Sequence, residues 1–384
     1  MAVVVACYAE VASRFEGTGG NYLYARAAFG RLAGIQIGWI TVLARLSASA
    51  ANANLLVIYL GEFWPGVVKG GVRFAILTLL VGALAAVNYR GVKGGTAVSD
   101  ALVVAKLLPL GILCLTGGLW LITRHFYVFE SGNAIPSHNW LKAMLLLFFA
   151  YGGYEAALNP MGEARNPRRD VAFALFAALA IITLIYVLIQ WIVVGVLADP
   201  AHSDRPLADA ARIVLGRSGG AIVAIGALVS CYGYLSANLL AGPRVTFALA
   251  EQGDFPRWFA AVHDTFRTPH FSIVVFALLT WVLALFGGFS WNVTLSAVAR
   301  LAYYATTCAA LPVLRRKHAQ SAWFRLPGGN VFAILGVLIC LALFTAVDFS
   351  KSVILAGTVC VAFLNWLAVR NRVAPAEGAQ HVER

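Results

Sequence analysis

Residues 148–171, FFAYGGYEAALNPMGEARNPRRDV, decide the fold of the chain, because they begin as a membrane helix and then interrupt it. The adjacent Gly152 and Gly153 each weaken a helix by about 1 kcal/mol relative to alanine, and Asn159 and Pro160 follow soon after. Inside a bilayer, the backbone groups freed by such a break are tolerated only where protein or a cavity surrounds them. Half-helix ends of this kind bind the charged groups of small solutes. A glycine kink for close helix packing is the alternative.

Outward from this stretch, the whole chain has the composition of a membrane protein. It has 384 residues, of which 60% are hydrophobic and 12% are charged, and its mean hydropathy is +0.79. Soluble domains carry about 25% charged residues, so we expect an all-α polytopic membrane protein. Polar breaks divide the chain into eleven candidate spans: residues 1–13 (a partial stub), 33–61, 72–89, 100–123, 138–160, 171–197, 219–248, 271–288, 291–313, 331–348 and 352–370.

The basic residues orient these spans and argue against nucleic acid as a partner. The net charge is +12, but Lys and Arg occur singly or in short clusters between apolar spans. The segments that follow spans one, three, five, seven, nine and eleven hold 17 of them, and the segments on the other side hold eight. Because cytoplasmic loops carry the excess of Lys and Arg, the first side is predicted to be cytoplasmic. This orientation places residues 371–384 in a cytoplasmic tail and Met1 outside.

The first span is too short to cross a bilayer. Residues 1–15, MAVVVACYAEVASRF, reach Arg14 after 13 residues, whereas a transmembrane helix needs about 20 apolar residues. No signal peptide explains an external Met1. We therefore expect this stub to be the inner half of a second span, preceded by a cytoplasmic segment and one more helix upstream.

Four stretches resemble bacterial permeases of the amino acid–polyamine–organocation superfamily. Residues 8–30, YAEVASRFEGTGGNYLYARAAFG, are similar to the segment that follows the second helix of these permeases. Residues 148–171 resemble the broken sixth helix, 242–273 the segment after the eighth, and 299–317 the tenth. The matches are long and correctly ordered, and together they cover nearly the whole chain.

The resemblance implies a fold of two inverted repeats of five helices, followed by two more helices. The chain is then a single transporter domain, residues 1–384. In this register, 1–123 are helices two to five of the first repeat, 138–313 the second repeat and 331–370 the last two helices. The first helix is absent, and with it half of the expected binding site. The resemblance leaves two explanations for this absence, a start assigned too late or a truncated product.

The same resemblance assigns a substrate site to the break. Phe149 and Tyr151 are expected to line or gate the pocket, and Gly152 and Gly153 to expose backbone groups to the substrate. Ser236 and Asn238 of the eighth helix are further candidates for the cavity wall. Hydrogen bonding between helices is the alternative for that pair.

Ionisable residues inside spans are costly, and by default they are functional candidates. By resemblance, Lys106 takes the place of a sodium ion and makes transport proton-dependent, whereas snorkelling toward the cytoplasmic face is its alternative. Glu155 is a gate, a proton carrier or a polar lock to helix three or ten. Arg45 has a structural or gating role, and pairing with a carboxylate would lower its cost. Arg300 is a weaker candidate of the same kind.

The sequence predicts neither an enzyme nor a metal or cofactor site. It has no catalytic triad and no complete phosphate loop, and its cysteines show no metal-ligand spacing. Cys7, Cys114, Cys231, Cys308, Cys340 and Cys360 all lie in apolar stretches, as buried free thiols do.

The resemblance therefore implies a secondary active transporter of amino acids in the bacterial cytoplasmic membrane, working by alternating access. Proton symport is the first expectation for its coupling, and exchange is the second. The competing class is a truncated product that does not transport. The aromatic lining favours a substrate with an apolar or neutral side chain. Polyamines, cationic amino acids and the oligomeric state stay open.

Overall fold

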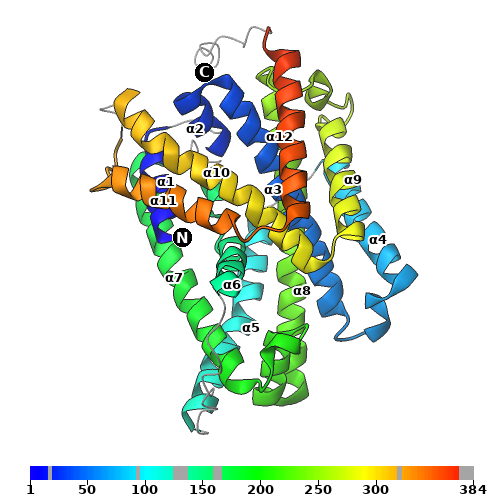
Figure 1. Cartoon of the computed structure of the whole chain (residues 1–384). Helices are drawn as coiled ribbons and strands as arrows, with labels where there is room; N and C mark the ends of the chain where they lie inside the picture. The colour runs from blue at the N-terminus through cyan, green and yellow to red at the C-terminus, as the bar shows by residue number, and fades with distance from the viewer. Residues whose placement is uncertain (16–19, 92–95, 124–136, 159–166, 318–321, 372–384) are drawn as a thin grey trace.

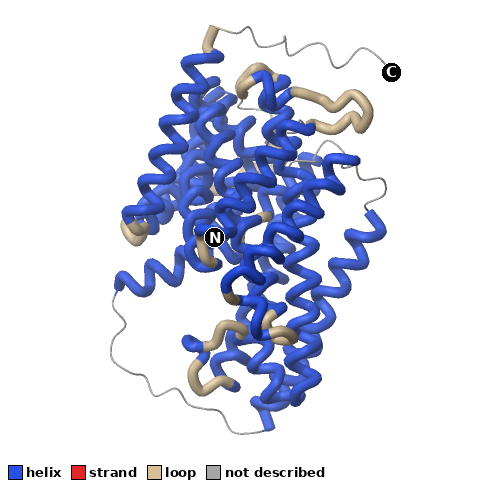
Figure 2. Tube along the Cα trace, turned by 90° about the vertical axis from the view of Figure 1, so that its right-hand side faces the viewer, coloured by secondary structure: helices blue, strands red, loops and turns tan. Residues whose placement is uncertain are grey.

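A computed structural model describes residues 1–15, 20–91, 96–123, 137–158, 167–317 and 322–371, and every regular element in these ranges is a helix (Figures 1 and 2). The α-helices are α1 (Ala2–Ala12), α2 (Gly20–Phe29), α3 (Arg31–Leu60), α4 (Gly70–Arg90), α5 (Thr96–Thr123), α6 (Ser137–Ala150), α7 (Pro167–Val196), α8 (Pro206–Glu251), α9 (His270–Phe286), α10 (Phe289–Lys317), α11 (Gly329–Phe344) and α12 (Phe349–Val369). Short 3₁₀ helices, among them η1 (Pro65–Val68), η2 (Tyr154–Leu158), η4 (Pro200–His202) and η5 (Arg257–Ala260), connect some of them.

Helix length and hydropathy make this chain a polytopic membrane protein. Within the described residues, α3, α4, α7, α8, α10 and α12 are long and apolar enough to cross a bilayer. Shorter apolar helices occupy α1, parts of α5 and α6, α9 and α11. All of these helices overlap the stretches expected from sequence. The inverted repeat, the division of the chain into its two repeats and last two helices, and the crossing of the bilayer by all eleven stretches stay predictions.

Two elements differ from the expectation. Helix α8 extends 13 residues ahead of the expected span that begins at residue 219, and Gly216, with φ 74° and ψ −168°, interrupts it just before that point. Helix α2 was not expected, because its ten residues are too short to span and include Asn21 and Arg26. It packs closely on α3 at Gly34, where an added Cβ would lie 2.8 Å from the Cβ of Arg26.

Helices α3 and α10 form the centre of the molecule and cross each other there (Figure 1). The stretch from Ser47 to Ala51 on α3 consists of small residues that are all buried. Small residues let helix backbones approach closely in membranes, where packing rather than hydrophobic burial holds helices together. The outer helices α4, α7 and α12 instead expose large apolar side chains, such as Leu79, Phe173 and Leu364.

Charged contacts collect at the two ends of α3. Beside its first residue, Arg31, the buried carboxylate of Asp254 binds Arg26 and Arg31 at 2.9 and 2.6 Å. Beyond its last residue, Glu62 pairs with Arg205, just ahead of α8, and with Arg212 in the second turn of α8. The helices therefore separate two polar ends with a largely apolar middle. The ion pair between Glu155 and Arg300 is an exception within that middle.

Candidate functional site

Helix α6 breaks at the two glycines that the sequence singles out. The α-helix ends at Ala150, the chain turns through Tyr151–Gly153, and η2 begins at Tyr154. Gly153 has φ +114°, a backbone conformation that side-chain-bearing residues rarely adopt. Its N–H donates to the Glu155 carboxylate at 2.9 Å, so a side chain two residues later satisfies a donor that the break has freed.

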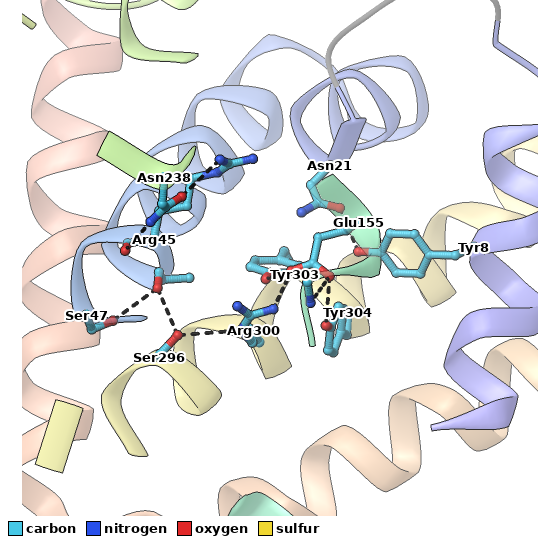
Figure 3. A network of polar contacts seen from close by, with 12 residues as sticks. Tyr8, Asn21, Arg45, Ser47, Glu155, Asn238, Ser296, Arg300, Tyr303 and Tyr304 are labelled. Atoms are coloured by element: carbon cyan, nitrogen blue, oxygen red, sulfur yellow. Dashed lines mark hydrogen bonds and ion pairs between the residues drawn. The ribbon is translucent and has the colours of Figure 1, made fainter. Parts of the chain in front are cut away.

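Glu155 also joins the break to α10. Its Oε1 accepts from Arg300 Nη1 at 2.5 Å and from the Tyr303 hydroxyl at 2.7 Å, and its Oε2 accepts from the Tyr304 hydroxyl at 3.2 Å (Figure 3). The Arg300 and Glu155 side chains are only 7% and 11% exposed. A charge pair that is removed from water in this way is held by its hydrogen bonds as well as by its attraction.

The Arg300 guanidinium lies directly against the break. A Cβ added to Gly152 would be 2.3 Å from Arg300 Nη1, so glycine is needed there for close approach. The guanidinium also lies over the Phe149 ring, 5.8 Å from its centre, and its Nε is 3.5 Å from Ser296 Oγ. Two of the residues expected to form the pocket, Phe149 and Gly152, therefore meet at one group, and that group is the Arg300 guanidinium.

Tyrosine rings pack beside this pair. Tyr154 stacks on Tyr304 with ring centres 5.8 Å apart, and Tyr8 of α1 meets both rings edge-on. The Tyr8 hydroxyl donates to Asn21 Oδ1 at 2.7 Å and accepts from Thr307 at 3.1 Å. The Tyr154 hydroxyl is buried without a hydrogen-bond partner among the described residues.

Arg45 and Asn238 meet on the other side of the network (Figure 3). Arg45 Nη1 donates to Asn238 Oδ1 at 3.3 Å, and Asn238 Nδ2 donates to the Arg45 carbonyl at 3.0 Å and to Ser49 Oγ at 2.5 Å. The partner of Arg45 is thus an amide, not the carboxylate considered from sequence. Ser296 Oγ, which contacts Arg300, donates to the carbonyl of Ala44 next to Arg45 at 2.8 Å. We call the residues from Glu155 through Arg300 and Ser296 to Arg45 and Asn238 the polar network.

Two of the remaining predicted site residues, Tyr151 and Ser236, make no hydrogen bond or ring contact with the network among the described residues. Tyr151 packs edge-on against Tyr186 of α7 at 5.2 Å, and the Tyr186 hydroxyl donates to the Ala150 carbonyl at 2.9 Å. Ser236 is partly buried on α8, one turn from Tyr232. Lys106 falls within α5, and its side chain lies outside the described residues.

Sequence reasoning missed the three tyrosines that complete the site. Tyr303 and Tyr304 are adjacent in ARLAYYATT, a pattern that also fits an ordinary membrane helix. Tyr8 sits in the short first span, whose role was judged by its length alone. The single available signal was Arg300, because an arginine nine residues into the expected span 291–313 needs a partner.

Other features of the described residues do not suggest a competing site. No group of three His, Cys, Asp or Glu side chains among them is placed to hold a metal ion. A surface hollow of about 460 Å³ lies between α4 and α9, and another of about 390 Å³ lies near Arg73. Neither hollow is lined by a member of the polar network.

The family model described as amino acid permease matches residues 1–366. The chain belongs to the amino acid permease family. This permease is 31% identical over 320 residues to an uncharacterized transporter of Mycobacterium tuberculosis, covering 79% of this chain and 68% of that protein. It is 26% identical to the methylthioribose transporter of Bacillus subtilis, with 96% and 81% covered, and 28% identical to the serine/threonine exchanger of the same organism, with 69% and 61% covered.

Proposed function

We propose that this permease is a secondary active transporter that moves amino acids across the bacterial cytoplasmic membrane by alternating access. Family membership and relatives that are named as transporters support the transport of amino acids or related solutes. The observation that carries the proposal is the break in α6, where Glu155 and Arg300 form an ion pair inside the apolar middle of the molecule. Charged groups at membrane depth mark transport pathways, and an interrupted helix is tolerated there only beside protein or a cavity.

The polar network suggests how the segment after α6 and helix α10 move relative to one another. Glu155 belongs to the segment after α6, and Arg300, Tyr303 and Tyr304 belong to α10, so their contacts hold these elements together. Opening a path at this point requires the contacts to be exchanged for others. Glu155 is thus a gate as well as a lock between α6 and α10. Phe149 of α6 and Tyr151 of the turn that follows are the proposed lining of the path.

Proton symport is the first choice of coupling, with Lys106 as the proposed coupling residue. Exchange of one amino acid for another is the second choice, and the similarity to a serine/threonine exchanger supports this alternative. The two modes differ in what drives accumulation, since symport needs a proton gradient and exchange needs a counter-substrate.

Uptake into proteoliposomes tests the proposal. The purified 384-residue chain is reconstituted, and uptake of a panel of radiolabelled amino acids is measured with and without an inside-alkaline pH gradient. A second set of vesicles is preloaded with unlabelled amino acid. Accumulation driven by the gradient supports symport, and uptake only into preloaded vesicles supports exchange. If a monodisperse, correctly inserted protein takes up no amino acid under either condition, the proposed function is wrong.

A matched pair of variants links the uptake to the site. Glu155→Gln is expected to abolish uptake, whereas Glu251→Gln removes an exposed carboxylate at the end of α8 and is expected to leave it unchanged. Equal uptake by both variants would show that transport does not require the Glu155 carboxylate.

A further inference from the structure

The charges of the polar network do not balance. It contains two guanidinium groups, Arg45 and Arg300, and one carboxylate, Glu155. Ser296 places them in one region, because its Oγ is 3.5 Å from Arg300 Nε and donates to the carbonyl of Ala44, the residue before Arg45, at 2.8 Å. An excess positive charge at membrane depth is expensive unless an anion compensates it.

The carboxylate has no capacity left for a substrate. Glu155 accepts hydrogen bonds from Arg300, Tyr303, Tyr304 and the N–H of Gly153. An ionised carboxylate offers about four lone-pair sites, and all are used. A substrate ammonium or guanidinium would have to displace Arg300, which is already bound at 2.5 Å.

Arg45, in contrast, has donors to spare. Its guanidinium carries five N–H donors, of which one contacts Asn238 at 3.3 Å. No carboxylate of the described residues lies within ion-pair distance of it, and the side chain is only partly buried. A planar guanidinium matches the two oxygens of a carboxylate as a fork, so the free side of Arg45 fits an anionic ligand group.

Asn238 holds this group in place. Its amide binds the Arg45 guanidinium and the Arg45 carbonyl together, and it also contacts Ser49, so it fixes the side chain relative to its own helix. An arginine that is oriented before the ligand arrives loses less conformational entropy on binding. Asn238 is therefore a positioning residue for Arg45.

We infer that the substrate of this permease is an acidic amino acid, and that Arg45 binds its side-chain carboxylate. The inference rests on the proposed transport of amino acids and goes beyond it by naming the substrate class. It departs from the sequence-based expectation of an apolar or neutral side chain, and it disfavours the polyamines and cationic amino acids that the sequence left open. The Glu155–Arg300 pair contributes no net charge, so Arg45 alone sets the sign of the substrate.

The substrate panel on the native protein is the first test. Uptake of glutamate or aspartate is expected to exceed uptake of leucine, serine, lysine and putrescine by at least about tenfold, because one unpaired cation discriminates strongly by charge. Uptake of a neutral or cationic member without uptake of glutamate or aspartate overturns the inference while leaving the proposed function intact. Uptake of no amino acid overturns both.

The second test is selectivity between glutamate and glutamine, which have nearly the same shape and differ in charge. Arg45→Gln is expected to raise the KM for glutamate about thirtyfold and to lower the glutamate-to-glutamine ratio of kcat/KM by a similar factor. Arg45→Lys keeps the charge, loses the fork and is expected to recover most of the ratio. Asn238→Ala is expected to raise the KM for glutamate with little change in kcat.

The control is Arg90→Gln, which removes an exposed arginine at the end of α4 and is expected to change neither parameter. A folding defect in an Arg45 variant would reduce glutamate and glutamine uptake together and leave their ratio unchanged. An unchanged ratio in a well-folded Arg45→Gln protein overturns the role of Arg45. If that variant does not insert, the panel on the native protein decides the substrate class by itself.

Discussion

At the residue scale, Glu155 has two tasks that a neutral side chain does not perform together. It caps the N–H of Gly153 at the helix break, and it neutralises Arg300. Removing one member of a buried ion pair leaves the other charged and uncompensated, which costs about 3–5 kcal/mol. The side chain therefore contributes to the stability of the permease as well as to its proposed gate.

We predict that Glu155→Gln lowers the thermal unfolding temperature of the detergent-purified permease by several degrees. The physical reason is the unpaired guanidinium that remains in the apolar middle. The double variant Glu155→Gln with Arg300→Gln is expected to recover part of the loss, because no isolated charge is left. Unfolding temperatures measured for both proteins decide the matter, and a double variant that loses as much as the two single variants combined would contradict the pairing.

Gly152 gives a second prediction for a single residue. Gly152→Ala is expected to displace the Arg300 guanidinium, since the new Cβ would lie 2.3 Å from Nη1. The matched control is Gly111→Ala in α5, where an added Cβ meets nothing within 4 Å. This control is expected to be neutral or stabilising by up to about 1 kcal/mol, because alanine favours the helix. The measurement is the unfolding temperature and uptake rate of each variant, and equal behaviour of the two glycines would contradict the close contact at the break.

The sequence supplied the parts of this site but not their pairing. Gly152, Gly153, Glu155 and Arg45 stand out because glycine pairs and charges are unusual inside apolar spans. The pairing of Glu155 with Arg300 joins positions 145 residues apart, and no local pattern encodes such a contact. Tyr303 and Tyr304 went unnoticed for a related reason, since a tyrosine in a membrane helix has no distinctive pattern until its hydroxyl partner is known.

At the scale of the elements, one carboxylate of α1 binds the ends of two other segments. The buried Glu10 binds Arg315 at the end of α10 and accepts from the backbone N–H of Leu326 at 2.8 Å, just ahead of α11. It also pairs with Arg14, two residues beyond the end of α1, at 2.7 Å. One side chain of an eleven-residue helix thus fixes the ends of two neighbouring helices.

We predict that Glu10→Gln makes the end of α10 more accessible to trypsin. Loss of the negative charge frees Arg315 from α1, and the adjacent Arg316 and Lys317 are exposed cleavage sites. Cleavage rates in inside-out vesicles are expected to rise several-fold relative to the native protein. Cleavage elsewhere in the chain serves as the internal control, and an unchanged rate at this end of α10 would show that Glu10 does not hold it.

Helix positions were predictable from the sequence because apolar length is set directly by the bilayer. The ends of α3, α4, α9 and α12 lie within three residues of the expected spans. The misses, α2 and the first part of α8, are polar or short segments that the bilayer does not constrain. Their positions depend on packing, such as the contact of α2 with Gly34.

At the scale of the whole molecule, the C-terminal end of α12 lies at the same end of the bundle as α2 (Figure 1). Asn365 of α12 binds the carbonyl of Asp254 at 2.7 Å, and the Asp254 carboxylate binds Arg26 and Arg31. The excess of basic residues in the segments at this end favours a cytoplasmic position for it. The opposite end holds Glu62, Arg205 and Arg212.

We predict which end of the bundle faces the cytoplasm from this excess of basic residues. In a background without cysteine, Asp204→Cys is expected to react with a membrane-impermeant maleimide in intact cells. Asp264→Cys is expected to react only after the membrane is permeabilised. Both positions are exposed, so access rather than burial decides the labelling. The opposite pattern would reverse the proposed orientation.

The unequal charges of the polar network also have an electrical consequence. In the proposed alternating-access cycle, Glu155 and Arg300 would move across the membrane field as a neutral pair, whereas Arg45 carries one positive charge. An acidic amino acid, which has a net charge of about −1 at neutral pH, would cancel that charge. Movement of the loaded site would then be independent of the membrane voltage, whereas movement of the empty site, with its net positive charge, would depend on it. Because a full elementary charge in a potential of 100 mV is worth about 2.3 kcal/mol, an inside-negative membrane would draw the empty carrier toward its inward-facing form.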